Sequence, residues 1–119
     1  MFDCCQCQGI EALFNEKSAR KEQKIYLRKG PRSTTAKLIR FITRYSRPEA
    51  SLLDIGGGIG IIQFELLKSG VSKAISVDAS SGYHKIAADT AATLGMTHKV
   101  TGIHADFADD GLQTEAADI

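Results

Sequence analysis

Apolar and polar residues alternate at helical spacing in the first part of the chain. Between residues 10 and 29 apolar side chains recur every three to four positions with charged residues between them, which predicts one helix. The Gly30–Pro31 pair ends this helix, because neither residue continues one well. A second helix is predicted to begin at Ser33 or Thr34, either of which can cap it, and to end at Pro48.

After Ala50 the pattern changes to short apolar runs that alternate with helical stretches. The predicted elements are strands over residues 51–55, 73–78 and 98–104, a helix over residues 61–68, a helix from Ser80 or Ser81 to Gly95, and the start of a fourth strand at residues 117–119. Alternation of this kind predicts a Rossmann-like, doubly wound parallel α/β sheet, here truncated after its third strand. We therefore divide the chain into an N-terminal helical segment, residues 1–47, and an incomplete α/β domain, residues 48–119.

Chemistry-bearing residues follow each predicted strand. The loop from Asp54 to Gly60 follows the first strand, Asp78 ends the second, and Asp106 follows the third. Right-handed crossovers bring the carboxyl ends of parallel strands to one edge of the sheet, where ligands bind in doubly wound folds. The sequence therefore predicts one ligand site built from these three loops.

The loop after the first strand is rich in glycine. Gly56, Gly58 and Gly60 allow a sharp turn and a close approach of the backbone to a ligand. The nicotinamide-dinucleotide pattern G-x-G-x-x-G is not met, because its third glycine falls at Ile61. A phosphate-binding P-loop is not met either, because no Gly-Lys-Ser/Thr follows. The loop instead reads D-x-G-x-G-x-G, beginning at Asp54.

From Leu52 to Gly60 the sequence resembles the first motif of class I S-adenosylmethionine-dependent methyltransferases. The resemblance covers about residues 50–119 and implies S-adenosyl-L-methionine as the cofactor. It implies that Asp54 helps to fix the ammonium group, and that Asp78 accepts hydrogen bonds from the ribose hydroxyls, which suits a two-oxygen carboxylate. The full set of cofactor-binding residues implied in this way is Asp54, Gly56, Gly57, Gly58, Gly60, Asp78, Ala79, Asp106 and Phe107, the last three beside the adenine.

Composition adds few constraints. The 119 residues carry a net charge of +1, and no apolar run is long enough to span a membrane, so we expect a cytoplasmic protein without a membrane partner. Cys4, Cys5 and Cys7 lie together at the N-terminus, but no second cysteine pair completes a four-ligand zinc site. We therefore predict no metal. The three histidines, His84, His98 and His104, are interpreted as structural residues, and the identity of any catalytic base stays open.

A basic stretch runs through the first predicted helix and just beyond it. Seven cations lie between residues 17 and 32, partly balanced by Glu16 and Glu22. The stretch is compatible with a patch for nucleic acid or membrane, but no aromatic residues alternate with the cations to stack bases. We favour a solvated helix face.

The resemblance implies methyl transfer by in-line displacement, for which a small molecule is the expected acceptor. A class I core usually has seven strands, so we expect this chain to be the N-terminal part of a longer methyltransferase, able to bind the cofactor weakly and inactive alone. Three alternatives stay open: a truncated, non-catalytic cofactor-binding module, a nucleic-acid methyltransferase led by the basic stretch, and a nicotinamide-dependent oxidoreductase. The acceptor atom and the oligomeric state are not predicted.

Overall fold

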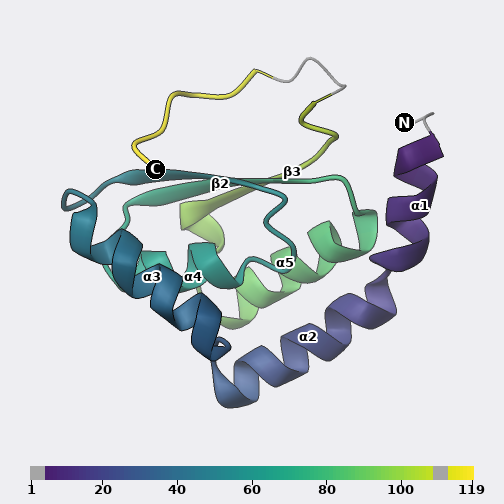
Figure 1. Ribbon diagram of the computed structural model, residues 1–119, viewed down its shortest axis with the longest axis horizontal. Coiled ribbons are helices and arrows are strands. Elements are labelled where there is room, and N and C mark those ends of the chain that lie inside the picture. The colour runs from purple at the N-terminus through teal and green to yellow at the C-terminus, as the bar shows by residue number, and fades with distance from the viewer. Residues whose placement is uncertain (1–4, 109–112) are drawn as a thin grey trace.

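The chain folds into a parallel sheet with helices gathered on one of its faces (Figure 1). The computed structural model describes the backbone of residues 5–108 and 113–119, and side chains from residue 9 onward within those ranges. The elements in chain order are α1 (Cys5–Leu13), α2 (Glu16–Lys29), α3 (Ser33–Tyr45), β1 (Ser51–Ile55), α4 (Ile61–Lys68), β2 (Lys73–Asp78), α5 (Ser81–Thr93), η1 (Thr97–Lys99) and β3 (Val100–His104).

The sheet has the order β1-β2-β3, with both pairs parallel. Asp54 lies opposite Ser76 in the first pair, and Asp78 lies opposite His104 in the second. Helices α3, α4 and α5 lie on the same side of the sheet, and α2 packs against α5 (Figure 1). The α/β architecture predicted from the alternating pattern is confirmed.

The last residues of the chain pair with the free edge of β1. Ile119 donates its N–H to the carbonyl oxygen of Ser51 at 3.1 Å, and its own carbonyl oxygen accepts from Leu53 N–H at 3.0 Å. This alternation of bonds to residues on either side of Leu52 is the pattern of a parallel ladder. Residues 118–119 therefore lie where a strand would extend the sheet on the other side of β1.

The core lies between the sheet and the helices. Its largest fully buried side chains include Phe64 and Leu66 of α4, Ile86 of α5 and Ile59 of the glycine loop. Leu52 and Ala74 contribute from the strands, and they point to the same face because they lie opposite each other in the β1–β2 ladder. Burial of these apolar side chains fixes the register of the strands and hence the position of their carboxyl ends.

The single helix predicted over residues 10–29 is wrong: the structure has two helices, α1 and α2, separated at Phe14 and Asn15. Asn15 begins α2, since its side-chain oxygen accepts a hydrogen bond from Ser18 N–H at 3.0 Å. An asparagine that caps a new helix offers the backbone an alternative to continuing the old one. Charged residues on both sides concealed this break in the hydrophobic pattern.

The third strand begins two residues later than predicted. Residues Thr97–Lys99 form a 3-10 turn, and the strand runs from Val100 to His104. The hydrogen bond from Lys99 N–H to the carbonyl oxygen of Met96, at 2.9 Å, closes this turn. Boundaries of this kind depend on local hydrogen bonds that alternation of side chains does not encode.

Several large apolar side chains stay exposed. On α3 they are Leu38 at 46%, Phe41 at 63% and Tyr45 at 70%, and on β1 Ile55 is 52% exposed. Helix α3 therefore carries an uncovered apolar face. Within the part of the chain that the structure describes, no helix is long and apolar enough to cross a membrane.

Candidate functional site

The three strand ends meet at one edge of the sheet, joined by backbone hydrogen bonds. Gly56, just after β1, donates its N–H to the carbonyl oxygen of Val77 at 2.7 Å. Ala105, just after β3, donates to the carbonyl oxygen of Asp78 at 3.0 Å. The structure therefore brings the glycine loop, Asp78 and the segment that contains Asp106 to a single edge.

The glycine loop turns sharply between β1 and α4. Gly58 and Gly60 have φ angles of +60° and +94°, in the left-handed region that glycine adopts without strain. A Cβ at Gly60 would also lie 2.7 Å from the Phe64 ring, a buried core side chain. The loop therefore brings α4 close to the sheet, with the N-terminal end of the helix directed toward the edge.

Asp54 lies beneath the glycine loop in a site with little access to solvent. Its Oδ2 is buried and has no hydrogen-bond partner among the residues that the structure describes. Burial, together with the smaller effect of the nearby charge of Asp78, raises the pKa of Asp54 to about 6. A Cβ at Gly57 would lie 2.9 Å from the same oxygen, so only glycine leaves room above this carboxylate.

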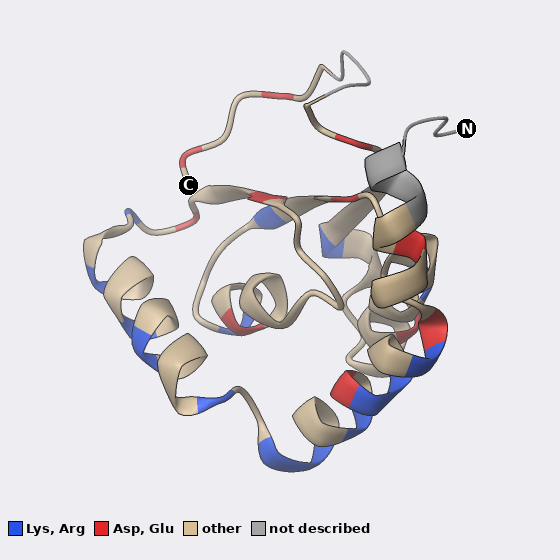
Figure 2. Cartoon of the chain, turned by 45° about the vertical axis from the view of Figure 1, so that its right-hand side comes forward, with Lys and Arg blue, Asp and Glu red and all other residues tan. Residues whose placement is uncertain are grey.

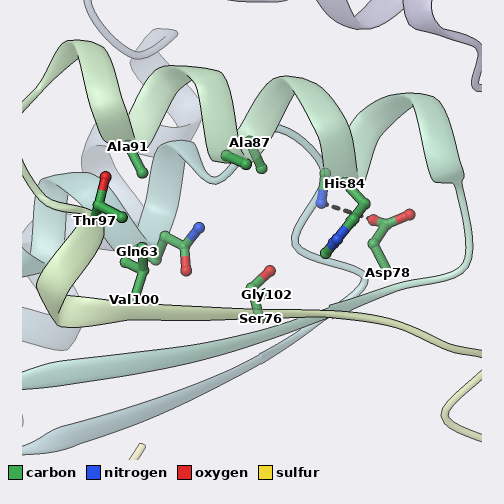
Figure 3. A pocket seen from close by; sticks show the side chains of 11 residues that line it. Gln63, Ser76, Asp78, His84, Ala87, Ala91, Thr97, Val100 and Gly102 are labelled. Atoms are coloured by element: carbon green, nitrogen blue, oxygen red, sulfur yellow. Dashed lines mark hydrogen bonds between the residues drawn. The ribbon is translucent and has the colours of Figure 1, made fainter.

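Asp78 at the end of β2 holds two loops through its side chain. Its Oδ2 accepts a hydrogen bond from Gly58 N–H at 2.8 Å, the contact drawn in Figure 3, and its Oδ1 accepts from Ser80 N–H at 2.7 Å. The first bond joins Asp78 to the glycine loop and the second fixes the turn into α5. Asp78 is half-buried, so one side of its carboxylate stays accessible.

The remaining predicted residues lie after β2 and β3. Ala79 is half-buried, and its carbonyl oxygen contacts His104 Nε2 at 3.0 Å. Asp106 is half-buried and accepts a hydrogen bond from Ala108 N–H at 3.0 Å, which closes a tight turn. Phe107 is 39% exposed at the same edge.

A cavity of about 210 Å³ opens beside Asp78 between α5 and the sheet (Figure 3). Gly58 and Asp78 line it, together with Gln63 and Ser76, which the sequence did not single out, and His84, which was interpreted as structural. Gln63 is 2% exposed, and its Oε1 has no partner among the described residues. An inward-facing glutamine in the first turn of an apolar helix was the available signal, and it was not used.

The N-terminal helices also reach this edge. Glu11 of α1 accepts hydrogen bonds from Ser81 N–H at 2.9 Å and from Ser81 Oγ at 2.6 Å, and lies 3.6 Å from His104 Nε2. These bonds hold the pKa of Glu11 below its usual value, the side-chain bond from Ser81 being the largest cause. The sequence did not single out Glu11, because a contact between distant elements leaves no local pattern.

The cysteines and histidines do not form a metal centre in the described part of the chain. Cys4 lies outside the described residues, as do the side chains of Cys5 and Cys7. Among the described side chains no group of three or more His, Cys, Asp and Glu could hold a metal ion. His84 and His104 stack with ring centroids 5.9 Å apart. Burial is the main cause that lowers the pKa of His84, and the charge of His104 lowers it further.

Known structures resemble this fold, although no protein-family model and no curated protein matches the chain. A candidate S-adenosyl-L-methionine-dependent methyltransferase from Methanococcus maripaludis is 20% identical with a TM-score of 0.64, over 84% of this chain and 46% of that protein. A SAM-dependent methyltransferase from Thiobacillus denitrificans, solved with S-adenosyl-L-homocysteine, is 24% identical with a TM-score of 0.55, over 64% of this chain and 30% of that protein. The chain has the N-terminal part of the methyltransferase fold.

This methyltransferase fold is shared with a protein named for another reaction. The [4+2]-cyclase SpnF is 24% identical with a TM-score of 0.54, over 59% of this chain and 26% of the cyclase. The chain thus spans less than half the length of each of these three structures. At these identities the likeness establishes the fold, and the reaction has to be argued from the site itself.

Proposed function

We propose that the chain binds S-adenosyl-L-methionine at the edge formed by the ends of β1, β2 and β3 and serves methyl transfer from it. The observation that carries this proposal is the pairing of Gly58 N–H with Asp78 Oδ2, at 2.8 Å, directly above the buried carboxylate of Asp54. A glycine turn and two carboxylates at one sheet edge match a ligand that has a ribose diol and a cationic amino-acid group.

The donor set suits the chemical groups of this cofactor. Asp54 Oδ2 is a buried acceptor without a partner in the described structure, and a buried unpaired carboxylate is costly unless a donor or a cation reaches it. The ammonium group of the methionine moiety is such a cation. Asp78 keeps an accessible side for a diol, while the N-terminal end of α4 favours the carboxylate of the same moiety. Ala79, Asp106 and Phe107 would border the adenine, with Phe107 covered by its ring.

In the proposed reaction the main role of the protein is to position the cofactor, and the protein itself forms no bond to the methyl group. The sulfonium of the bound cofactor supplies an activated methyl group, which leaves by in-line displacement without a covalent intermediate on the protein. Asp54, the glycine loop and Asp78 would hold the two ends of the cofactor and so fix the direction in which the methyl group faces. The groups that bind the acceptor and remove its proton stay unassigned.

Two proposals differ in the molecule that accepts the methyl group. A small molecule is the acceptor expected from the sequence, and no described side chain argues for a particular one. A nucleic acid is favoured by one specific observation, the unpaired basic surface of α2 described in the next subsection. A truncated module that binds the cofactor without turnover would share the same site.

Calorimetric titration of the chain with S-adenosyl-L-methionine, S-adenosyl-L-homocysteine and NAD⁺ tests the proposed cofactor. We expect one site per chain for the first two ligands and no heat for NAD⁺. Binding of NAD⁺ in preference to both sulfur ligands would instead favour the oxidoreductase alternative. Steady methyl transfer by the purified chain would contradict the expectation that it is inactive alone.

A further inference from the structure

The charges of this chain are strongly segregated along the sequence and in space. Residues 17–47 contain 11 of the 15 Lys and Arg residues and one of the 14 Asp and Glu residues, so that this segment carries +10 and the remainder −9. Figure 2 shows the basic positions along the outer side of α2 and around the corner that leads to α3. The net charge of +1 is therefore the sum of a strongly basic segment and a strongly acidic remainder.

Five of these cations form a continuous row on α2, which we name the α2 stripe: Lys17, Arg20, Lys21, Lys24 and Arg28. Their spacing of three and four residues places them on one face of the helix. The opposite face is buried, with Ala19 and Tyr26 at 0% and 4% exposed, and α2 packs against α5. The stripe extends for about 17 Å, at 1.5 Å per residue, and borders a shallow open groove that Ile25 helps to line.

Most cations of the stripe have no acidic partner. In the part of the chain that the structure describes, no carboxylate oxygen lies within 4.0 Å of Lys17, Lys21, Lys24 or Arg28, while Arg20 pairs with Glu16 at 3.0 Å. Outside residues 17–47, by contrast, three of the four lysines pair with a glutamate: Lys68, Lys73 and Lys85, at 2.8, 2.7 and 3.2 Å. Like charges at helical neighbour positions destabilise α2, so the stripe does not serve folding.

We propose that the α2 stripe binds the phosphodiester backbone of a nucleic acid. An extended row of unpaired cations fits a ligand with repeated negative charges better than a single small anion. A membrane surface is disfavoured, because a helix that inserts into one needs a broad exposed apolar face, and the one exposed large apolar side chain of α2 is Leu27, at 43%. Contacts to phosphate groups carry no sequence information, so we expect this binding to be independent of base sequence.

The stripe begins beside the proposed cofactor edge. The backbone of Asn15 and Glu16, at the start of α2, packs directly on Gly82 in the first turn of α5. That turn follows Asp78 by only a few residues, and Lys85 pairs with Glu16 at 3.2 Å across the same contact. A nucleic acid along α2 would therefore have one end near the three strand ends, although the stripe does not depend on cofactor binding.

Fluorescence anisotropy with a labelled DNA duplex of about 20 base pairs tests the proposal, with the salt concentration varied from about 50 to about 200 mM. We expect log affinity to fall against log salt with a slope of about −3.6, from four contacts at about 0.9 each, which is roughly a hundredfold loss over this range. A duplex of scrambled sequence should bind equally well. Absence of binding at the lowest salt, or preference for one sequence, would overturn the proposal.

Two variants with equal loss of charge localise the effect. The stripe variant combines Lys17→Gln, Lys21→Gln, Lys24→Gln and Arg28→Gln, and the matched control combines Lys68→Gln, Lys73→Gln, Lys85→Gln and Lys99→Gln. The stripe variant should lose at least tenfold in affinity and most of the salt slope, and the control less than threefold. Equal losses would mean that net charge alone attracts the duplex, contrary to the proposal.

Two further measurements separate this proposal from its alternatives and from the cofactor site. Vesicles of phosphatidylserine should bind more weakly than the duplex, and stripe-dependent binding to vesicles alone would overturn the nucleic-acid assignment. Asp78→Ala should lose S-adenosyl-L-methionine and keep the duplex, whereas the stripe variant should do the opposite. If the affinity for the duplex fell with Asp78→Ala and not with the stripe variant, the nucleic-acid site would have to lie elsewhere than on α2.

Discussion

Asp78 and Gly58 are joined by a hydrogen bond of 2.8 Å between a carboxylate oxygen and a backbone amide 20 residues earlier in the chain. The same carboxylate accepts Ser80 N–H at 2.7 Å, so that one side chain couples the turn after β1 to the turn after β2. Hydrogen bonds to an ionised acceptor are stronger than neutral ones. Asp78 is therefore both a proposed cofactor ligand and a support for the loop that would contact the cofactor.

Replacing Asp78 by alanine should weaken the site in two measurable ways. We expect the affinity for S-adenosyl-L-methionine to fall by about 1–3 kcal/mol, or roughly ten- to a hundredfold, because hydrogen bonds to a charged group are lost. The melting temperature should fall as well, since Gly58 N–H loses its acceptor. Asp89→Ala, on the exposed side of α5, is the control and should change neither quantity appreciably. An unchanged dissociation constant for Asp78→Ala would remove this residue from the site.

The buried carboxylate of Asp54 should make stability depend on pH. Its pKa is raised to about 6, so the folded state binds a proton more tightly than the unfolded state does. Stability should therefore fall as the pH rises from about 4 to about 6, and should not recover above that range on account of this group. Asp54→Asn should be more stable than the parent chain near pH 8, by on the order of 2 kcal/mol, and about equal to it near pH 4. Urea unfolding at the two pH values measures this difference.

The same carboxylate should make cofactor binding depend on pH in the opposite sense. A cationic group beside Asp54 favours the ionised form, so the affinity for S-adenosyl-L-methionine should increase as the pH rises through about 6. Asp54→Asn should bind more weakly and lose this pH dependence. Titrations at several pH values check both points, and a wild-type affinity that is flat between about pH 5 and about pH 8 would place the cation elsewhere.

The contact between the N-terminal helices and α5 can be tested at one glycine. A Cβ at Gly82 would lie 2.8 Å from the Asn15 carbonyl carbon and 2.9 Å from Glu16 Cα, both backbone atoms that cannot turn aside. Gly82→Ala should therefore destabilise the chain by about 1–3 kcal/mol, the usual cost of overpacking. Gly9→Ala is a matched control, since Gly9 also lies in a helix and has open space around it. That change should be neutral or stabilising by up to about 1 kcal/mol.

Two tyrosines differ in environment and should differ in their response to loss of the hydroxyl. Tyr26 is 4% exposed and donates to Glu65 Oε2 at 2.7 Å, whereas Tyr45 is 70% exposed on α3. Tyr26→Phe should lower the free energy of unfolding by about 1 kcal/mol or somewhat more, because the acceptor is charged. Tyr45→Phe should have no measurable effect. Similar losses at both positions would contradict the observed burial of Tyr26.

The parallel sheet was predictable because its determinants are local. Each strand is a short apolar run that ends where polar residues begin, as at Val77 and Asp78. The right-handed crossovers then bring the strand ends to one edge of the sheet. For the same reason the proximity of Gly58 and Asp78 could be expected. The break at Asn15 could not, because a capping side chain competes with a helix that has equally good periodicity on both sides.

The features that could not be predicted from the sequence depend on contacts between distant elements. Glu11 reaches Ser81 across 70 residues, and Gln63 is buried against a cavity whose other walls come from α5 and β3. The unpaired state of the α2 stripe was also hidden, since the basic residues are visible in the sequence but their acidic partners, or the lack of them, are not. Each of these features arises when elements distant in the sequence pack together, a step that hydrophobic spacing does not specify.

The cofactor site is tested most directly by amide chemical shifts of the isotopically labelled chain during titration with S-adenosyl-L-homocysteine. The account predicts that the shifts which change gather at the three strand ends, in residues 54–60, 78–80 and 105–107, while the amides of α2 stay unperturbed. Saturable changes confined to any other part of the fold, or an unchanged spectrum at millimolar ligand, would contradict it.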